Sequence, residues 1–127
     1  MGAPIASDIG VDEYSILAPS AVNDLRVTRA VTASDVLTAT LRWTAPTNAL
    51  TTTLRYSGTL ITAANWNGAS LLTDNLAGTA NNFTATVPYD SGTIYFALKT
   101  QNGTGWSPLS NNAFWPQQSV YLPVILK

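Results

Sequence analysis

The stretch Thr93–Asn111, TIYFALKTQNGTGWSPLSN, constrains the fold more than any other part of the 127-residue chain. It opens with six residues in which apolar side chains alternate, and a period of two indicates a half-buried β-strand. The side chains that share the apolar face are Ile94, Phe96 and Leu98. Residues 101–105 then supply turn chemistry, and Pro108 follows, which cannot donate a hydrogen bond within a sheet. The stretch therefore predicts a β-hairpin that closes a sandwich, with a second strand that lies at a sheet edge or starts irregularly.

Several segments resemble those of bacterial extracellular fibronectin type III domains, and they occur in the same order along the chain. These segments are PSAVNDLRVT, LTATLRWTAP, TTTLRYS with the ITAANW that follows it, TANNFTATV, and the YFALK and WSPLSN of the hairpin. The likeness covers residues 19–112. It implies an all-β fold, a seven-stranded antiparallel fibronectin type III or immunoglobulin-like sandwich with Greek-key connections. It implies no activity, because one fold hosts many functions.

The resemblance assigns Trp43 to the hydrophobic core of this sandwich. The residues before it alternate strictly, and Trp43 falls on the apolar side. That parity argues against the alternative, in which Trp43 is an exposed platform for a sugar ring. The core residues that we expect are Leu25, Leu41, Trp43, Phe83, Phe96 and Leu98.

One segment departs from the family pattern. The turn before the hairpin is PYDSGT, at residues 88–93, whereas the family uses an L-x-P-G-T turn followed by a corner tyrosine. Counted back from the hairpin turn, the position of that tyrosine falls on Ile94. Counted forward from the PYDSGT turn, it falls on Tyr95. Either the corner is lost, or a bulge shifts the register by one residue. We favour the loss, because Ile94 already belongs to a regular apolar face.

Three tryptophans outside the expected core are candidates for contact with a surface ligand. They are Trp66, Trp106 and Trp115. The resemblance implies that Trp66 is a rim residue packed across the sheet. An exposed Trp66 that binds sugar is the less favoured interpretation. A surface polysaccharide is accordingly among the partners that we consider.

Two strand-like extensions flank the domain, at residues 1–18 and 113–127. The first has no proline between Ile5 and Ile16, so every amide there can join a β-ladder. We expect it to act as a donor strand for a sheet edge of a neighbouring copy, through Ile5, Ile9, Val11, Tyr14 and Ile16. Pairing with an edge strand of its own sandwich is a nearly equal alternative. The ending VYLPVILK resembles short tails of secreted proteins from Chloroflexi-type bacteria.

The composition argues against several classes of function. The chain has no histidine and no cysteine, which removes the commonest general base and the commonest metal ligands. A net charge of −1 leaves no basic surface for nucleic acid. No apolar run approaches the ~20 residues of a membrane span. The acidic group formed by Asp8, Asp12 and Glu13 lacks the spacing of a calcium loop, and we interpret it as a solvated edge. We therefore predict no catalytic, cofactor-binding or metal-binding residue, and no cofactor.

Two hypotheses for the function follow from the sequence. The leading one is a non-enzymatic, structural or adhesive subunit, located outside the cell or on its surface, that assembles with copies of itself into a filament or layer by strand addition. The alternative is a spacer or carbohydrate-binding module of a larger secreted bacterial enzyme.

Overall fold

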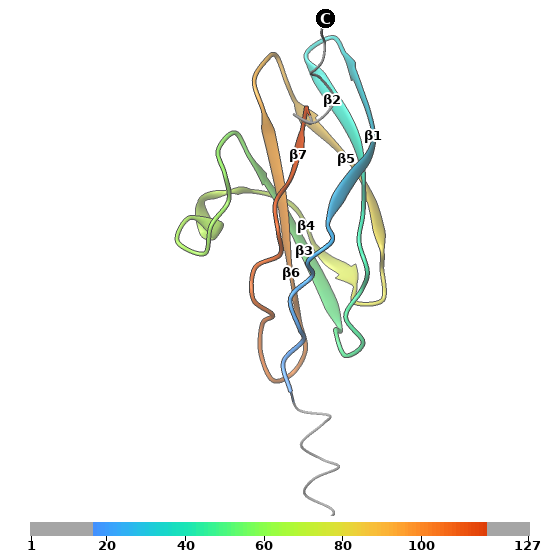
Figure 1. Cartoon of the computed structure of the whole chain (residues 1–127), viewed down its shortest axis with the longest axis vertical. Helices are drawn as coiled ribbons and strands as arrows, with labels where there is room; N and C mark the ends of the chain where they lie inside the picture. Colours follow the sequence, from blue (N-terminus) through green and yellow to red (C-terminus); the bar gives the residue numbers. More distant parts are fainter. Residues whose placement is uncertain (1–16, 117–127) are drawn as a thin grey trace, which may run out of the picture.

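The computed structural model describes residues 17–116, which form an all-β sandwich of two antiparallel sheets (Figure 1). The three-stranded sheet has the order β1-β2-β5, with β1 (Arg26–Ala33), β2 (Val36–Arg42) and β5 (Asn82–Pro88). The four-stranded sheet has the order β4-β3-β6-β7, with β3 (Thr51–Ser57), β4 (Ser70–Ala77), β6 (Ile94–Gln101) and β7 (Ala113–Trp115). The predicted seven-stranded antiparallel sandwich is confirmed.

The predictions for the two extensions fall mostly outside the described residues. All five members of the expected donor segment lie there, namely Ile5, Ile9, Val11, Tyr14 and Ile16. The alternation expected in the VYLPVILK ending lies there too. Strand addition by residues 1–18 therefore stays a prediction.

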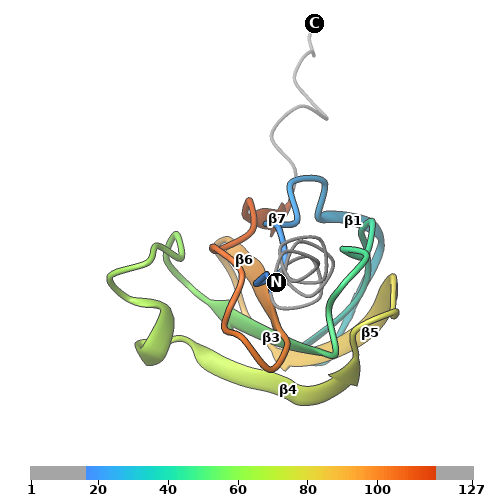
Figure 2. The ribbon, with the colours of Figure 1, turned by 90° about the horizontal axis from the view of Figure 1, so that it is seen from below.

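The hydrophobic core lies between the two sheets, which face each other when the sandwich is seen end-on (Figure 2). The apolar side chains of β2, β3 and β6 with no exposed surface are Leu37, Ala39, Leu41, Leu54, Phe96, Ala97 and Leu98, and all but Ala97 face inward. Trp43 keeps only 3% of its surface exposed, and Leu25 is buried in the same cluster. Phe83 packs against this cluster but is only half-buried, whereas Ala85 and Val87 further along β5 are buried.

The register of β6 settles the position of the family's corner tyrosine. β3 and β6 pair without a shift from Thr51↔Gln101 to Ser57↔Tyr95, so no bulge is present. Ile94 consequently faces the core, whereas the Tyr95 ring lies on the outer face beside Phe114. The corner is lost, and the hydroxyl of Tyr89 instead donates a hydrogen bond to the carbonyl of Gly92 (3.0 Å).

As Pro108 led us to expect, the segment after β6 starts irregularly, and the strand that follows it, β7, lies at a sheet edge. Trp106 makes a single bridge with Gln101, and the regular pairing resumes only at β7. Pro108 has no N–H group, and two buried serines fill the gap that it leaves. The hydroxyl of Ser107 accepts the Thr100 amide and that of Ser110 accepts the Leu98 amide, both at 2.9 Å. The last strand therefore lies beyond residue 112, inside the range that we had assigned to the C-terminal tail.

Two asparagines that follow Ser110 bind segments far away in the sequence. The Asn111 amide group bonds both the N–H and the carbonyl of Leu25, each at 2.9 Å. The Asn112 amide group does the same with Ile61, also at 2.9 Å. The two neighbours thus fasten the chain to two different regions, the entry into β1 and the connection between β3 and β4.

The only helical element within residues 17–116 is a single 3₁₀ turn, η1 (Trp66–Gly68), in the connection between β3 and β4. No helix in the described part of the chain is long and apolar enough to cross a membrane.

Candidate functional site

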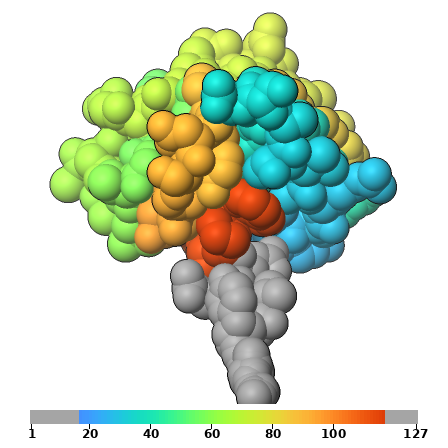
Figure 3. Space-filling view, turned by 90° about the horizontal axis from the view of Figure 1, so that it is seen from above, coloured from blue at the N-terminus to red at the C-terminus, as the bar shows by residue number. Residues whose placement is uncertain are grey.

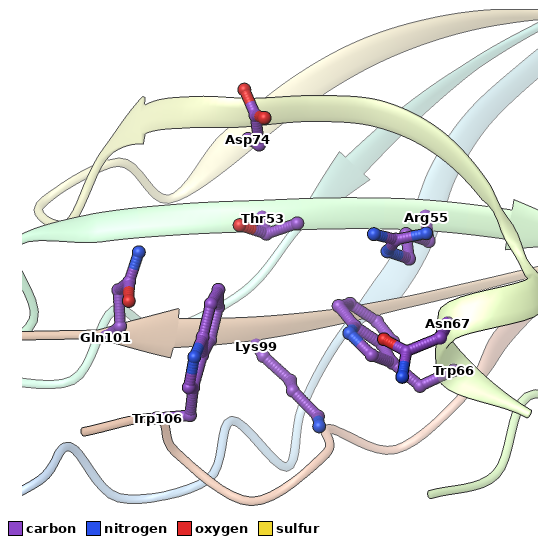
Figure 4. Close-up of a pocket in the computed structure, with 8 residues that line it drawn as sticks. All are labelled: Thr53, Arg55, Trp66, Asn67, Asp74, Lys99, Gln101 and Trp106. Atoms are coloured by element: carbon purple, nitrogen blue, oxygen red, sulfur yellow. The ribbon is translucent and has the colours of Figure 1, made fainter. Parts of the chain in front are cut away.

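The outer face of the four-stranded sheet carries a polar depression of about 400 Å³ (Figure 4). β3 and β6 alternate, so Thr53 and Arg55 point outward from one strand and Lys99 and Gln101 from the other, opposite to the core face. The residues that line the depression are Thr53, Arg55, Trp66, Asn67, Asp74, Lys99, Gln101 and Trp106.

The connection 58–69, which we call the roof loop, covers one end of this outer face. The side chain of Asn65 organises it, since its oxygen accepts the Thr62 amide (2.7 Å) and its nitrogen donates to the Leu60 carbonyl (3.0 Å). Asn112 holds the loop at Ile61, and Arg55 donates to the Ala69 carbonyl (2.8 Å). These contacts make the loop a fixed part of the sheet surface.

Trp66 is the residue that the roof loop buries against the sheet. It keeps 6% of its surface exposed, and it forms a small outer cluster with Ile61, Ala69 and Ala97. The Arg55 guanidinium and the Lys99 ammonium each lie 5.1 Å from the centre of its ring. Cation–π attraction of this kind fixes the two cations beside the depression.

Trp106 forms the opposite wall of the depression, with 48% of its surface exposed. The turn before it is held by Asn102, whose side-chain oxygen accepts the amides of Thr104 (2.8 Å) and Gly105 (3.3 Å). The bridge between Trp106 and Gln101 then fixes the backbone position from which the indole projects. In Figure 4 the Trp106 ring stands beside Lys99 and Gln101, on the side away from Trp66.

Two buried polar atoms of the depression have no hydrogen-bond partner in the described part of the chain. They are the hydroxyl of Thr53, a residue that is 3% exposed, and Nε of Arg55. Buried polar groups without partners cost free energy. Both atoms belong to residues that line the depression, but neither atom is itself open to the space of the depression.

The structure brings together two of the three tryptophans that we considered for ligand contact. Trp66 and Trp106 line the same depression, whereas Trp115 is half-buried near the end of the core, with its ring 5.4 Å from that of Tyr89. Sequence reasoning did not single out Arg55, Lys99 and the other polar residues of the site. For Arg55 and Lys99 the signal was present, because they have the opposite parity to Leu54 and Leu98 on the same two strands.

A second hollow lies at one end of the sandwich, lined by the tip of the β1–β2 hairpin and the turn that precedes β6. The two segments, cyan and orange, adjoin in the view from above (Figure 3). Ser34 and Asp35 form the tip with φ values of 50° and 70°, which suit a tight two-residue hairpin turn. The Tyr89 amide donates to the Asp35 carbonyl (2.7 Å), and Asp90 lies nearby. The aromatic residue that lines this hollow, Tyr89, is less exposed than Trp106, and its hydroxyl is bonded to the Gly92 carbonyl. Within residues 17–116 there is also no group of three or more potential metal ligands.

Comparisons with known proteins support the fold. A scan against protein-family models gives no match, and neither does a search of curated proteins. Among solved structures, a Fn3-like protein from Clostridium thermocellum is 21% identical, with a TM-score of 0.57 over 77% of this chain and 92% of that one. A human fibronectin type III domain derived from the KIAA0970 protein is 10% identical, with a TM-score of 0.59 over 91% and 92% of the two chains. The likeness shows a fibronectin type III fold and does not extend to a ligand.

Proposed function

We propose that this protein is a non-catalytic, extracellular module that binds polysaccharide in the depression between Trp66 and Trp106. The observation that carries the proposal is the half-exposed Trp106 indole standing over a floor of polar side chains that include two cations and a carboxylate. A sugar ring has apolar C–H faces and a rim of hydroxyls. It therefore suits a flat aromatic wall next to hydrogen-bonding groups.

Three properties support a binding role over a catalytic one. The chain contains no histidine or cysteine to serve as a base or a thiol nucleophile. Asp74 is the only carboxylate that lines the depression, whereas glycoside hydrolysis ordinarily uses two. Domains with this fold are generally non-catalytic, and a place as a spacer in a larger protein is compatible with the same fold.

Affinity electrophoresis in gels that contain soluble plant, algal or bacterial polysaccharides tests this proposal. The full chain should be retarded by at least one of them, and Trp106→Ala should abolish the retardation, whereas Trp106→Phe should keep part of it. Val31→Ala is the matched control, because Val31 is also half-exposed but lies on the other sheet. Retardation that Trp106→Ala leaves unchanged would refute this site, and the absence of retardation by every polysaccharide would refute the function.

Self-assembly by strand addition is a second candidate. It is favoured by β4, which within residues 17–116 has a strand on one side only and carries the half-exposed Leu71. An open edge with an apolar side chain is a template for a further strand. The proposed donor is residues 1–18. Deleting them should leave a folded monomer by light scattering and circular dichroism, and a truncated protein that assembles like the full chain would contradict the donor role.

A further inference from the structure

The charges in the Trp66–Trp106 depression point to a particular class of sugar. Arg55, Lys99 and Asp74 all line it. The one ion pair within residues 17–116 joins Arg26 and Asp24 (3.6 Å), so these three groups are not paired with one another. Two cations and one carboxylate therefore face a shared space with one positive charge in excess.

The two cations are held in place before any ligand arrives. In Figure 4 the Trp66 indole lies between the Arg55 guanidinium and the Lys99 side chain. Both cations contact that ring, and Arg55 is fixed further by its bond to the Ala69 carbonyl. A ligand thus loses little side-chain entropy in engaging them. A guanidinium and an ammonium held against one ring form their strongest hydrogen bonds with a charged acceptor such as a carboxylate.

We infer that the depression selects sugars that carry a carboxylate, that is, uronic acids or similar acidic residues of a polysaccharide. This inference rests on the proposed function. The ring of the sugar packs against Trp106, and its carboxylate lies towards Lys99 and Arg55. The hydroxyls bond to Asp74 and Gln101.

Asp74 distinguishes this class from polyanions of higher charge. It is positioned on β4, across β3 from Lys99 (Figure 4). A carboxylate there accepts hydrogen bonds from sugar hydroxyls, but it repels a nucleic-acid or polyphosphate backbone that presents charge along its whole length. The excess of a single positive charge matches one carboxylate per ring.

Matched oligosaccharides test the inference on the full chain by isothermal titration calorimetry. Hexamers of galacturonic, glucuronic and mannuronic acid are each compared with the carboxyl-reduced hexamer, which keeps the linkages and loses the charge. At least one acidic hexamer should bind about tenfold more tightly than its neutral counterpart. The preference should shrink as salt rises from 20 to 300 mM, because exposed charges are screened.

Variants locate the effect. Lys99→Gln should lower the ratio of acidic to neutral affinity towards one, and Asp74→Asn should increase that ratio. Arg42→Gln is the control, because Arg42 lies opposite Arg26 on the outer face of the other sheet, where an anion could bind without the depression. A preference lost in Arg42→Gln and kept in Lys99→Gln would overturn the inference.

The outcomes separate this inference from the proposed function. Equal binding of acidic and neutral hexamers, abolished by Trp106→Ala, would keep the sugar site and overturn the acid selectivity. Failure of every hexamer and every polysaccharide to bind would overturn both. Circular dichroism of each variant shows that loss of binding is not loss of fold.

Discussion

Trp43 and Trp66 are buried to nearly the same degree, at 3% and 6% exposed, in two regions that differ in everything else. Trp43 lies between the two sheets in the principal core, where its neighbours are aliphatic and aromatic side chains from both layers. Trp66 lies outside the four-stranded sheet, beneath the roof loop, and two cations contact its ring. Burial alone therefore does not distinguish a residue that builds the fold from one that builds a site.

The difference lies in how each tryptophan is held. The principal core is formed by regular alternation on paired strands. The outer cluster is smaller, and it sits beneath a loop, with two cations against its ring. Buried polar atoms without a partner do not separate the two regions, because the indole nitrogen of Trp43 lacks one in the described part of the chain, as do Nε of Arg55 and the hydroxyl of Thr53. The two cations on the outer face are what favours a binding role there.

The largest effect that we expect comes from the principal core. Trp43→Ala should lower the free energy of unfolding by about 3–5 kcal/mol, because it leaves a cavity between the two sheets. Urea denaturation followed by circular dichroism measures this change. A loss below ~1 kcal/mol would show that Trp43 is not central to the core.

Trp66→Ala should have a smaller effect on stability and a larger one on the site. We expect a loss of about 1–3 kcal/mol, because the ring covers only one face of a sheet that is packed on the other. The far-UV spectrum should stay unchanged while sugar binding disappears. Trp66→Phe is the matched control, since it retains an aromatic ring for the two cations. Loss of the whole fold in Trp66→Ala would remove the distinction between the two regions.

Asn111 and Asn112 test whether the two regions are independent, because each makes two hydrogen bonds to a different region. Asn111→Ala and Asn112→Ala should each cost about 1–2 kcal/mol. Amide hydrogen exchange should separate them. Asn112→Ala should accelerate exchange in the roof loop, and Asn111→Ala should do so around Leu25. The same exchange pattern in both variants would contradict the independence of the two regions.

The smallest effect that we expect is on the pH dependence of stability. Hydrogen bonds from the hydroxyl (2.6 Å) and amide (2.9 Å) of Thr44 lower the pKa of Asp24, with a smaller contribution from Arg26. A carboxylate whose folded pKa is depressed stabilises the fold above its unfolded pKa of about 3.9. That contribution is lost as the pH falls through the lower folded value.

The free energy of unfolding of Asp24→Asn and Thr44→Val, measured as the pH is lowered, gives this contribution of Asp24. Both variants should lose stability less steeply than the parent chain below pH 4. The outer cluster should not respond in this way, because Arg55 and Lys99 have no carboxylate partner in the described part of the chain. If both variants lose stability below pH 4 as steeply as the parent chain, the Asp24 bonds contribute nothing to folding.

The sequence predicted the sandwich and the inward faces of its strands well, because period-two alternation is a local signal. It missed the end of the domain, since Pro108 interrupts the ladder and β7 starts only at Ala113. It also could not assemble the site. The position of Trp66 depends on bonds between Ile61 and Asn112, which are 51 residues apart. No local pattern specifies a contact of that kind.

The segment from Ser107 to Asn112 also determines how the domain would carry a mechanical load. The described chain begins at one end of the sandwich and finishes at the other, so a pull on its two ends acts along the strands (Figure 1). The bonds of Asn111 to Val22 and Leu25 run between neighbouring segments, across that direction. Tension along the strands therefore loads these hydrogen bonds at the same time, so they break together and not one after another. These hydrogen bonds are where a stretched chain would resist first.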